Sequence, residues 1–239
     1  MSKRLVLISG KTTTGKSASL RNIKDPEGVL YMGAEGGKDL PFASQFKEVI
    51  ITDPYQVFQL FDLAEQKQEC HTLVIDSITY LMDMFETQYV LASDDTRKAW
   101  GDYAQYFKKL IQEKVAKSTK NVIMTAHTDT LLNDQENFME TKVPIKGALK
   151  NQGIESYFSC IVSTKRVSLD KLKDFQNENL HITEEDIQNG YKYVFQTRTT
   201  KETINERIRN PMGMWAFNET YIDNDVQILI DRLEKYYGK

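Results

Sequence analysis

The sequence predicts an α/β fold with a mostly parallel sheet and helices on both faces. Short apolar runs of strand length alternate with longer segments of helical periodicity. The first apolar run, Leu5-Val6-Leu7-Ile8, leads directly into a turn rich in glycine and threonine. The 239 residues, 40% hydrophobic and 27% charged, suffice for one large α/β domain. Since no repeat or linker interrupts them, we expect a single domain over residues 1–239.

The remaining elements follow in order. Apolar runs predict further strands in 28–37, 48–53, 72–77, 121–127, 157–167 and 191–200. Helical periodicity predicts helices over 78–91 and 96–118, one capped by Asp53 that begins with Pro54, and an amphipathic helix near the end capped by Asp223. A polar excursion from Ser168 to Gly190 separates the last two strands.

The turn after the first strand contains a complete phosphate-binding motif. The run Gly10-x-x-x-x-Gly15-Lys16-Ser17 matches G-x-x-x-x-G-K-[ST]. By chance the pattern would occur in about 1% of chains this long. Lys16 would reach the β- and γ-phosphates of ATP, the Ser17 hydroxyl would bind Mg²⁺, and a helix starting near Lys16 would direct its positive end at the phosphates. The residues expected to hold the nucleotide are Gly10, Lys11, Thr12, Thr13, Thr14, Gly15, Lys16, Ser17 and Ala18.

A buried strand ending in aspartate supplies the second part of such a site. The run "LVIDS" puts Asp76 at a strand tip, where it would hold Mg²⁺ through water. A buried strand that merely ends in a turn aspartate is the alternative. The next residue is Ser77, whereas a glutamate here would act as a base. The base must therefore come from elsewhere in the chain, or there is none.

Two more strand tips carry polar side chains. Glu35 ends the strand in 28–37, and His127 ends "NVIMTAH". Because the ends of parallel strands meet at one edge of a sheet, we expect both beside the phosphates. Glu35 would orient and deprotonate the attacking water, and His127 would contact the γ-phosphate and signal to the next loop. A solvated glutamate and a structural histidine are the alternatives.

Composition and charge exclude several classes of protein. The net charge of −3 gives no global basic field, so any nucleic-acid contact must come from a local patch. Cys70 and Cys160 are the only cysteines, which argues against a disulfide framework or a zinc site. No apolar run approaches membrane-spanning length, and the apolar start is too short for a signal peptide. We expect a soluble cytoplasmic protein.

Together these motifs resemble the RecA-type P-loop ATPase core. The resemblance runs from about residue 3 to 235 and is carried by the P-loop, "MGAEGG", "LVIDS", "VIMTAH" and "ERIRNPMGMW". The closest likeness is to the short bacteriophage ATPases that consist of a RecA core alone and include single-strand annealing recombinases. It implies a phage-encoded protein of the host cytoplasm that uses ATP and Mg²⁺. It also implies a ring or filament of identical subunits with shared ATP sites.

The resemblance further implies DNA-facing loops and an arginine donated between subunits. The first loop would lie near 87–100, and the second, a long loop over 128–152, would carry Lys142, Lys146, Lys150 and Phe138 for single-stranded DNA. The second loop also holds acidic residues that would repel phosphate: Asp129, Asp134, Glu136 and Glu140. Arg207 and Arg209 would reach the γ-phosphate of a neighbouring protomer.

Three functions remain open at this stage. The first is an ATPase that binds single-stranded DNA and promotes annealing or recombination. The second is an oligomeric motor or loader, such as a helicase or a packaging accessory. The third is a small-molecule kinase, against which stands the lack of an arginine-rich lid. The guanine-reading Asn-Lys-x-Asp motif of GTPases is absent from the sequence.

Overall fold

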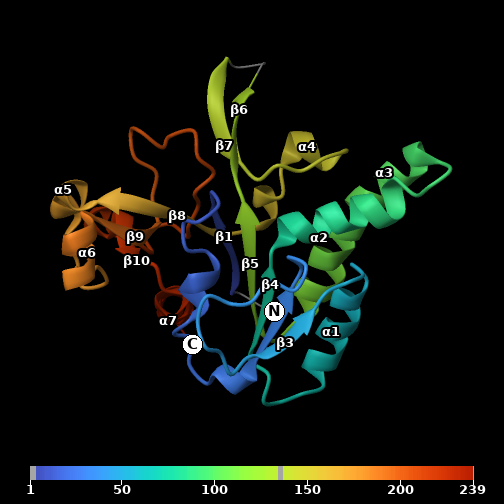
Figure 1. Ribbon diagram of the computed structural model, residues 1–239, viewed down its shortest axis with the longest axis horizontal. Coiled ribbons are helices and arrows are strands. Elements are labelled where there is room, and N and C mark those ends of the chain that lie inside the picture. The colour runs from blue at the N-terminus through green and yellow to red at the C-terminus, as the bar shows by residue number, and fades with distance from the viewer. Residues whose placement is uncertain (1–3, 134–136, 239) are drawn as a thin grey trace.

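The chain folds around one large sheet, seen in a computed structural model that describes residues 4–133 and 137–238 (Figure 1). The sheet has eight strands in the order β10-β9-β8-β1-β5-β4-β2-β3. All neighbouring pairs from β8 to β3 are parallel, whereas β9 runs antiparallel to β8 and β10. This confirms the predicted α/β fold built on a mostly parallel sheet.

The strands and helices follow the predicted alternation. The strands of the large sheet are β1 (Leu5–Gly10), β2 (Val29–Gly33), β3 (Lys47–Ile50), β4 (Thr72–Asp76), β5 (Asn121–His127), β8 (Cys160–Ser168), β9 (Tyr191–Gln196) and β10 (Tyr221–Asp223). The α-helices are α1 (Gln56–Glu65), α2 (Ile78–Phe85), α3 (Thr96–Lys109), α4 (Leu149–Gln152), α5 (Leu169–Leu172), α6 (Glu184–Asn189) and α7 (Val226–Tyr237). Among the described residues, no helix is long and apolar enough to span a membrane.

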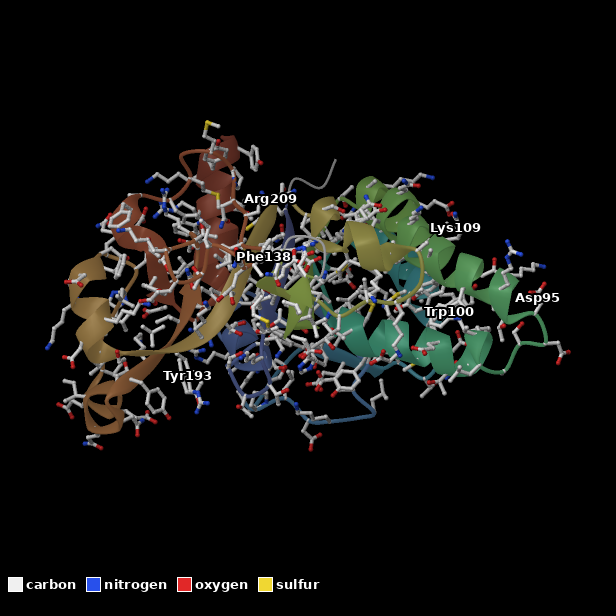
Figure 2. All side chains as sticks on the ribbon, turned by 90° about the horizontal axis from the view of Figure 1, so that it is seen from above. Asp95, Trp100, Lys109, Phe138, Tyr193 and Arg209 are labelled. Carbon is white, nitrogen blue, oxygen red and sulfur yellow. The ribbon has the colours of Figure 1, made fainter. Side chains whose placement is uncertain are left out.

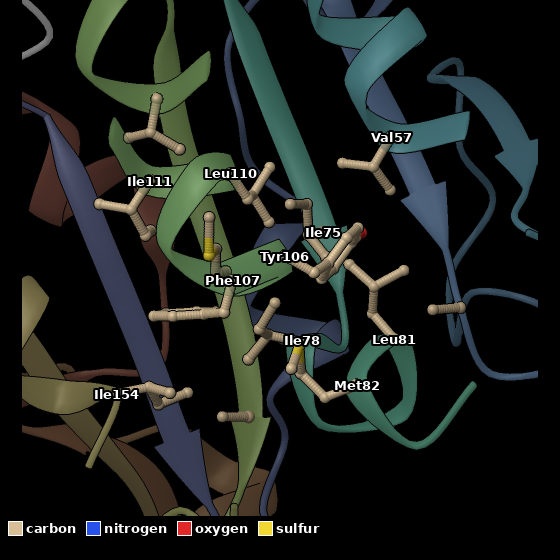
Figure 3. Close-up of a cluster of buried hydrophobic side chains, with 14 of the residues drawn as sticks. Val57, Ile75, Ile78, Leu81, Met82, Tyr106, Phe107, Leu110, Ile111 and Ile154 are labelled. Atoms are coloured by element: carbon tan, nitrogen blue, oxygen red, sulfur yellow. The ribbon is translucent and has the colours of Figure 1, made fainter. Parts of the chain in front are cut away.

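Strand alternation directs the apolar side chains of β1 to cores on opposite faces of the sheet. In β1, Leu7 joins the core beneath α1, α2 and α3, while Val6 and Ile8 face α7 on the opposite side of the sheet. Figure 3 shows the first core, in which Phe107 of α3 and Leu110, directly after α3, pack against the sheet. Helices therefore cover both faces and leave the ends of the strands open for a site.

Strand register brings the predicted site residues to one edge of the sheet. Gly10 pairs with His127 across β1 and β5, and Gly33 pairs with Asp76 across β2 and β4. Each of these residues ends its strand. The turn after β1 and the segment after β2 therefore begin at this same edge, as the parallel order requires.

The structure corrects several local predictions. No long helix follows the P-loop: a single 3₁₀ turn, Ser17–Leu20, takes its place, so a strong helix dipole does not face the site. Helix α1 begins at Gln56, after Tyr55, rather than at Pro54. Asp225, not Asp223, caps α7, because Asp223 ends the unpredicted strand β10.

The predicted long loop after His127 is largely a β-hairpin. Strands β6 (Asp129–Asn133) and β7 (Phe138–Lys142) pair antiparallel and project above the end of β5 (Figure 1). The predicted acidic positions Asp134 and Glu136 lie outside the described residues. The other predicted loop, 87–100, is mostly helical, with a π-helical turn at Glu86–Val90 and α3 from Thr96.

Candidate active site

Two glycines allow the turn after β1 to fold tightly. A Cβ on Gly10 would lie 2.1 Å from Oγ1 of Thr164, and a Cβ on Gly15 would lie 2.3 Å from Nδ2 of Asn224. Gly15 also has φ +94°, a backbone conformation that side chains oppose. Gly10 therefore needs glycine for space, and Gly15 needs it for both space and conformation.

Lys16 is buried against the loop that it follows. Its Nζ donates to the carbonyls of Gly10 at 3.0 Å and Lys11 at 2.9 Å, and the residue is only 7% exposed. Burial lowers the pKa of the Lys16 ammonium to about 8, although the carboxylates of Asp76 and Glu35 act in the opposite direction. A bound phosphate group would give the Lys16 ammonium a negatively charged partner in place of these neutral carbonyls.

Two of the three threonines of the loop donate their hydroxyl protons to carbonyls of the loop itself. Thr13 donates to the carbonyl of Thr12, and Thr14 donates to the carbonyl of Lys11, each at 2.7 Å. Thr14 also contacts Oγ1 of Thr164 at 2.6 Å on β8. These bonds fix the loop without using its backbone N–H groups, which stay available for phosphate oxygens.

Asp76 lies at the tip of β4 but is enclosed. The residue is 1% exposed, and its carboxylate accepts hydrogen bonds from the hydroxyls of Tyr31, at 2.9 Å, and Thr125. Burial, with the Asp76 charge next, raises the pKa of Tyr31, which keeps that phenol protonated as a donor. Sequence reasoning missed both donors, although each lies on a strand beside β4.

Glu35 is held by two cationic or proton-donating neighbours. His127 Nε2 lies 3.3 Å from Oε1, and Lys38 Nζ lies 3.0 Å from Oε2. The hydrogen bond from His127, with help from Lys38 and against partial burial, lowers the pKa of Glu35 to about 2. Glu35 is therefore ionised at neutral pH. Lys38, three residues later, was not predicted to take part.

His127 links Glu35 to the P-loop. Its Nδ1 lies 3.4 Å from both Lys16 Nζ and Thr12 Oγ1. A neutral ring with its proton on Nε2 satisfies all these contacts, because Nε2 then donates to Glu35 while Nδ1 accepts from Lys16 or Thr12. The backbone N–H of His127 donates to Thr79 at 2.9 Å, which fixes the end of β5.

A cavity of about 900 Å³ opens beside these residues, within the range of ligand sites. Of the predicted nucleotide residues, Thr12, Thr13, Gly15, Lys16, Ser17 and Ala18 line it together with Glu35 and His127, whereas Gly10, Lys11 and Thr14 do not. The opposite wall comes from α6, β9 and β10, which lie in or beside the polar excursion. Sequence reasoning gave that excursion no role.

Some of the oxygen atoms near the P-loop could serve as ligands for a hard cation such as Mg²⁺. Ser17 lines the cavity, and its hydroxyl is an oxygen ligand of the kind that Mg²⁺ prefers. Asp76 does not line the cavity, yet each of its oxygens keeps a second lone pair for a water molecule. Among the described residues, no cluster of three or more histidine, cysteine or acidic side chains could hold a metal. A cation here would thus depend on Ser17 and phosphate oxygens.

Arg207 and Arg209 lie outside this cavity. Arg207 forms an ion pair of 2.7 Å with Glu140 on β7 and lies 3.6 Å from Glu155. Arg209 is exposed and bridges to Ile161 through its backbone, and its side chain has no ion-pair partner among the described residues. Arg209 is therefore the freer of the two cations.

The residues predicted to contact DNA lie on or after the hairpin. Lys142 pairs with Glu140 at 2.9 Å and Lys146 pairs with Glu86 at 2.6 Å. Lys150 is exposed, with no ion-pair partner in the part of the chain that the structure describes, and Phe138 at the start of β7 is half-buried. The structure places Phe138 and Lys142 on the hairpin and Lys146 and Lys150 in the segment after it, and it neutralises two of the three lysines.

Comparison with protein-family models agrees with a P-loop core. A family model described as an AAA domain (AAA_24) matches residues 2–205. A KaiC-like protein from the archaeon Pyrococcus horikoshii has a similar structure over 85% of this chain and 82% of its own, with 17% identity and a TM-score of 0.46. That similarity is too weak to bear on activity. No curated protein matches the sequence.

Proposed function

The chain belongs to the AAA domain family of P-loop ATPases, and we propose that its cavity binds ATP with Mg²⁺ and hydrolyses the γ-phosphate. One observation carries this proposal: Lys16, His127 and Glu35 form a chain of contacts at 3.4 and 3.3 Å beside the P-loop. A phosphate-binding cation is thereby connected to a carboxylate that can hold water.

Lys16 is the residue that binds the terminal phosphates. Its present partners are the loop's own carbonyls, so its ammonium can turn to phosphate oxygens over a short distance. The backbone N–H groups between Gly10 and Ser17 surround the remaining oxygens. Mg²⁺ would be held by Ser17 and phosphate oxygens, with Asp76 contributing through water, and would neutralise charge on the phosphates.

Glu35 positions the attacking water. A carboxylate whose pKa is about 2 is a weak base at neutral pH, so while it is bonded to His127 it orients water better than it removes a proton. When Lys16 moves to phosphate, His127 loses a donor to its Nδ1 and can reorient toward the γ-phosphate. His127 would thus connect the presence of that phosphate to Glu35 and to the hairpin that begins at Asp129.

Single-stranded DNA is the proposed partner of the hairpin, and annealing or recombination is the proposed outcome of binding. The observation in favour is geometric: the hairpin follows His127 after one residue, projects from the body and carries Phe138 and Lys142 (Figure 1). An aromatic ring and cations on one projection suit stacking of bases and contact with phosphates. A motor or loader that uses the same hairpin against protein is the competing proposal.

Phosphate release from the purified chain tests the proposal. We expect the wild-type protein to release phosphate from MgATP without an acceptor, and Lys16→Ala to lose at least about a hundredfold in rate, as when one main stabiliser of the transition state is removed. Lys24→Ala is the control, since Lys24 pairs with Asp231 outside the cavity. A rate that requires a small-molecule acceptor would indicate a kinase instead. A rate that rises with added single-stranded DNA more than with duplex then supports the DNA partner, whereas a rate that neither DNA changes supports the motor or loader that acts on protein.

A further inference from the structure

The cavity has a second wall that takes no part in phosphate chemistry. It comes from the last third of the chain and includes His181, Asp186, Tyr193 and Asn224. Figure 2 shows Tyr193 toward one end of the molecule, with Asp95 at the tip of the opposite end. Since Lys16 and Ser17 take the phosphates at the first wall, the rest of a nucleotide has to lie toward this second one.

The second wall is attached directly to the P-loop. Nδ2 of Asn224 donates to the carbonyl of Gly15 at 2.9 Å, and Arg21 donates to the carbonyl of Asn224 at 3.0 Å. These contacts join segments more than two hundred residues apart in the sequence. The distance between the phosphate site and the second wall is therefore fixed before any ligand binds.

Ion pairs order the wall itself. Nδ1 of His181 lies 2.7 Å from Asp223, and Lys192 contacts Asp186 at 3.0 Å and Asp223 at 3.3 Å. The Thr183 side chain caps α6 in a capping box with Asp186. The polar excursion is thus a defined surface facing the cavity.

Tyr193 presents an aromatic face on this wall. The residue is 38% exposed and lines the cavity, and its Cδ1 lies 3.5 Å from where a Cβ on Gly15 would be. Its ring also packs edge-on against Tyr191 at 5.8 Å between centroids, which limits its rotation. An exposed, supported ring next to a phosphate loop is suited to stack on a nucleobase.

We propose that this wall binds the nucleoside half of the nucleotide, with Tyr193 stacked on the base. The inference rests on the proposed ATP site, because it assumes that the phosphates occupy the P-loop. It gives the polar excursion a function: α6, β9 and the turn after β10 hold a recognition surface at a set distance from Gly15.

Calorimetric titration of the full chain with two probes, MgATP and tripolyphosphate, tests the inference. We expect Tyr193→Ala to weaken ATP binding about tenfold, the effect of losing one base stack, and to leave tripolyphosphate binding within about twofold of wild type. Tyr193→Phe should bind both probes like wild type, because it keeps the ring. Tyr236→Ala is the matched control, since that tyrosine is 41% exposed and lies outside the cavity.

Each contrary result has one meaning. Unchanged ATP affinity in Tyr193→Ala overturns the inference, and so does an equal loss of both probes, which would indicate a distorted P-loop. Wild-type protein that binds tripolyphosphate as tightly as ATP also overturns it while leaving the phosphate site intact. Wild-type protein that binds neither probe overturns the proposed function itself.

Discussion

Nε2 of His127 lies 3.3 Å from Oε1 of Glu35, although 92 residues separate them in the sequence. The contact exists because β2 and β5 run parallel and both end at the edge of the sheet that holds the P-loop. It connects a ring that touches Lys16 to a carboxylate that faces the cavity. Most of the predictions about catalysis follow from this relationship.

Replacing Glu35 with glutamine should separate ATP binding from ATP hydrolysis. The amide keeps the size of the side chain but loses the charge that orients water, so we expect the turnover rate to fall about a hundredfold or more. ATP affinity should stay close to wild type, because Lys16 and the loop are intact. Phosphate release and calorimetry measure the two quantities. Wild-type turnover in Glu35→Gln would remove Glu35 from the mechanism.

Removing the His127 ring should raise the pKa of Glu35. The bond from His127 is the largest cause of the lowered pKa, so His127→Ala should move it from about 2 toward the ordinary glutamate value, with Lys38 retaining part of the effect. Because its pKa is higher, Glu35 in the variant takes up a proton at a higher pH than in the wild type. Carbon NMR of the side-chain carboxyl during acid titration reports this directly, and Tyr80→Phe, which keeps a ring beside His127, serves as control.

ATP affinity should fall as the pH rises above about 8. In the free protein the pKa of Lys16 is about 8, so at higher pH the side chain is mostly neutral and must take up a proton to bind phosphate. One linked proton gives up to about a tenfold rise in Kd per pH unit. Lys16→Arg should bind without this dependence between pH 8 and 10, because its guanidinium stays charged. A wild-type Kd that is flat over that range contradicts a lowered Lys16 pKa.

Much of the site could be predicted because its signals are local. The P-loop pattern fits in eight residues, and Glu35, Asp76 and His127 each end an apolar run. Parallel order then places those ends together, whatever the details of packing. The same local reasoning assigned the fold class.

The second wall could not be predicted in this way. Asn224 contacts Gly15 although 209 residues separate them, and nothing in the sequence near either residue indicates the contact.

The hairpin was missed for another reason. Buried and exposed side chains do not alternate along β6, where Asp129, Thr130, Leu131 and Leu132 are all exposed, so the segment resembles a polar loop. Its pairing is stabilised in part by Asn205 and Arg207, whose backbones bond to Thr141 from a distant segment.

If the hairpin binds single-stranded DNA, Lys142→Ala with Lys146→Ala should flatten the salt dependence of binding only modestly. Both lysines already neutralise carboxylates, Glu140 and Glu86, so fewer counterions are released than two free lysines would release. We expect the slope of log K against log salt to fall by less than about 1.4, the value for two full contacts.

Fluorescence anisotropy with a labelled oligonucleotide at several salt concentrations gives this slope. Lys150→Ala should lower the slope by up to about 0.7, which is more than each of the two paired lysines contributes. The reason is that Lys150 has no ion-pair partner in the described ranges 4–133 and 137–238. Lys67→Ala with Lys117→Ala is the control, because both are exposed outside the hairpin and the segment after it. Identical slopes in all variants would remove the hairpin from the path of DNA.

The final prediction is that neighbouring protomers share the ATP site. Arg207→Ala with Arg209→Ala should reduce turnover about a thousandfold, the effect of losing an arginine that stabilises the transition state. Because Arg207 is held by Glu140 in its own chain, Arg209→Ala alone should account for most of the loss. Neither arginine lines the cavity of its own subunit, so the effect has to come from the next one.

Mixing two inactive variants tests that arrangement. Lys16→Ala chains keep both arginines, and the arginine double variant keeps an intact P-loop, so mixed assemblies contain some complete sites and should recover part of the ATPase rate. A mixture of Lys16→Ala with Glu35→Gln should recover none, because every P-loop cavity then carries a defect of its own. Full activity of the arginine double variant by itself would mean that each subunit hydrolyses ATP alone. Recovery in the first mixture but not the second would place an arginine of one chain at the γ-phosphate of another.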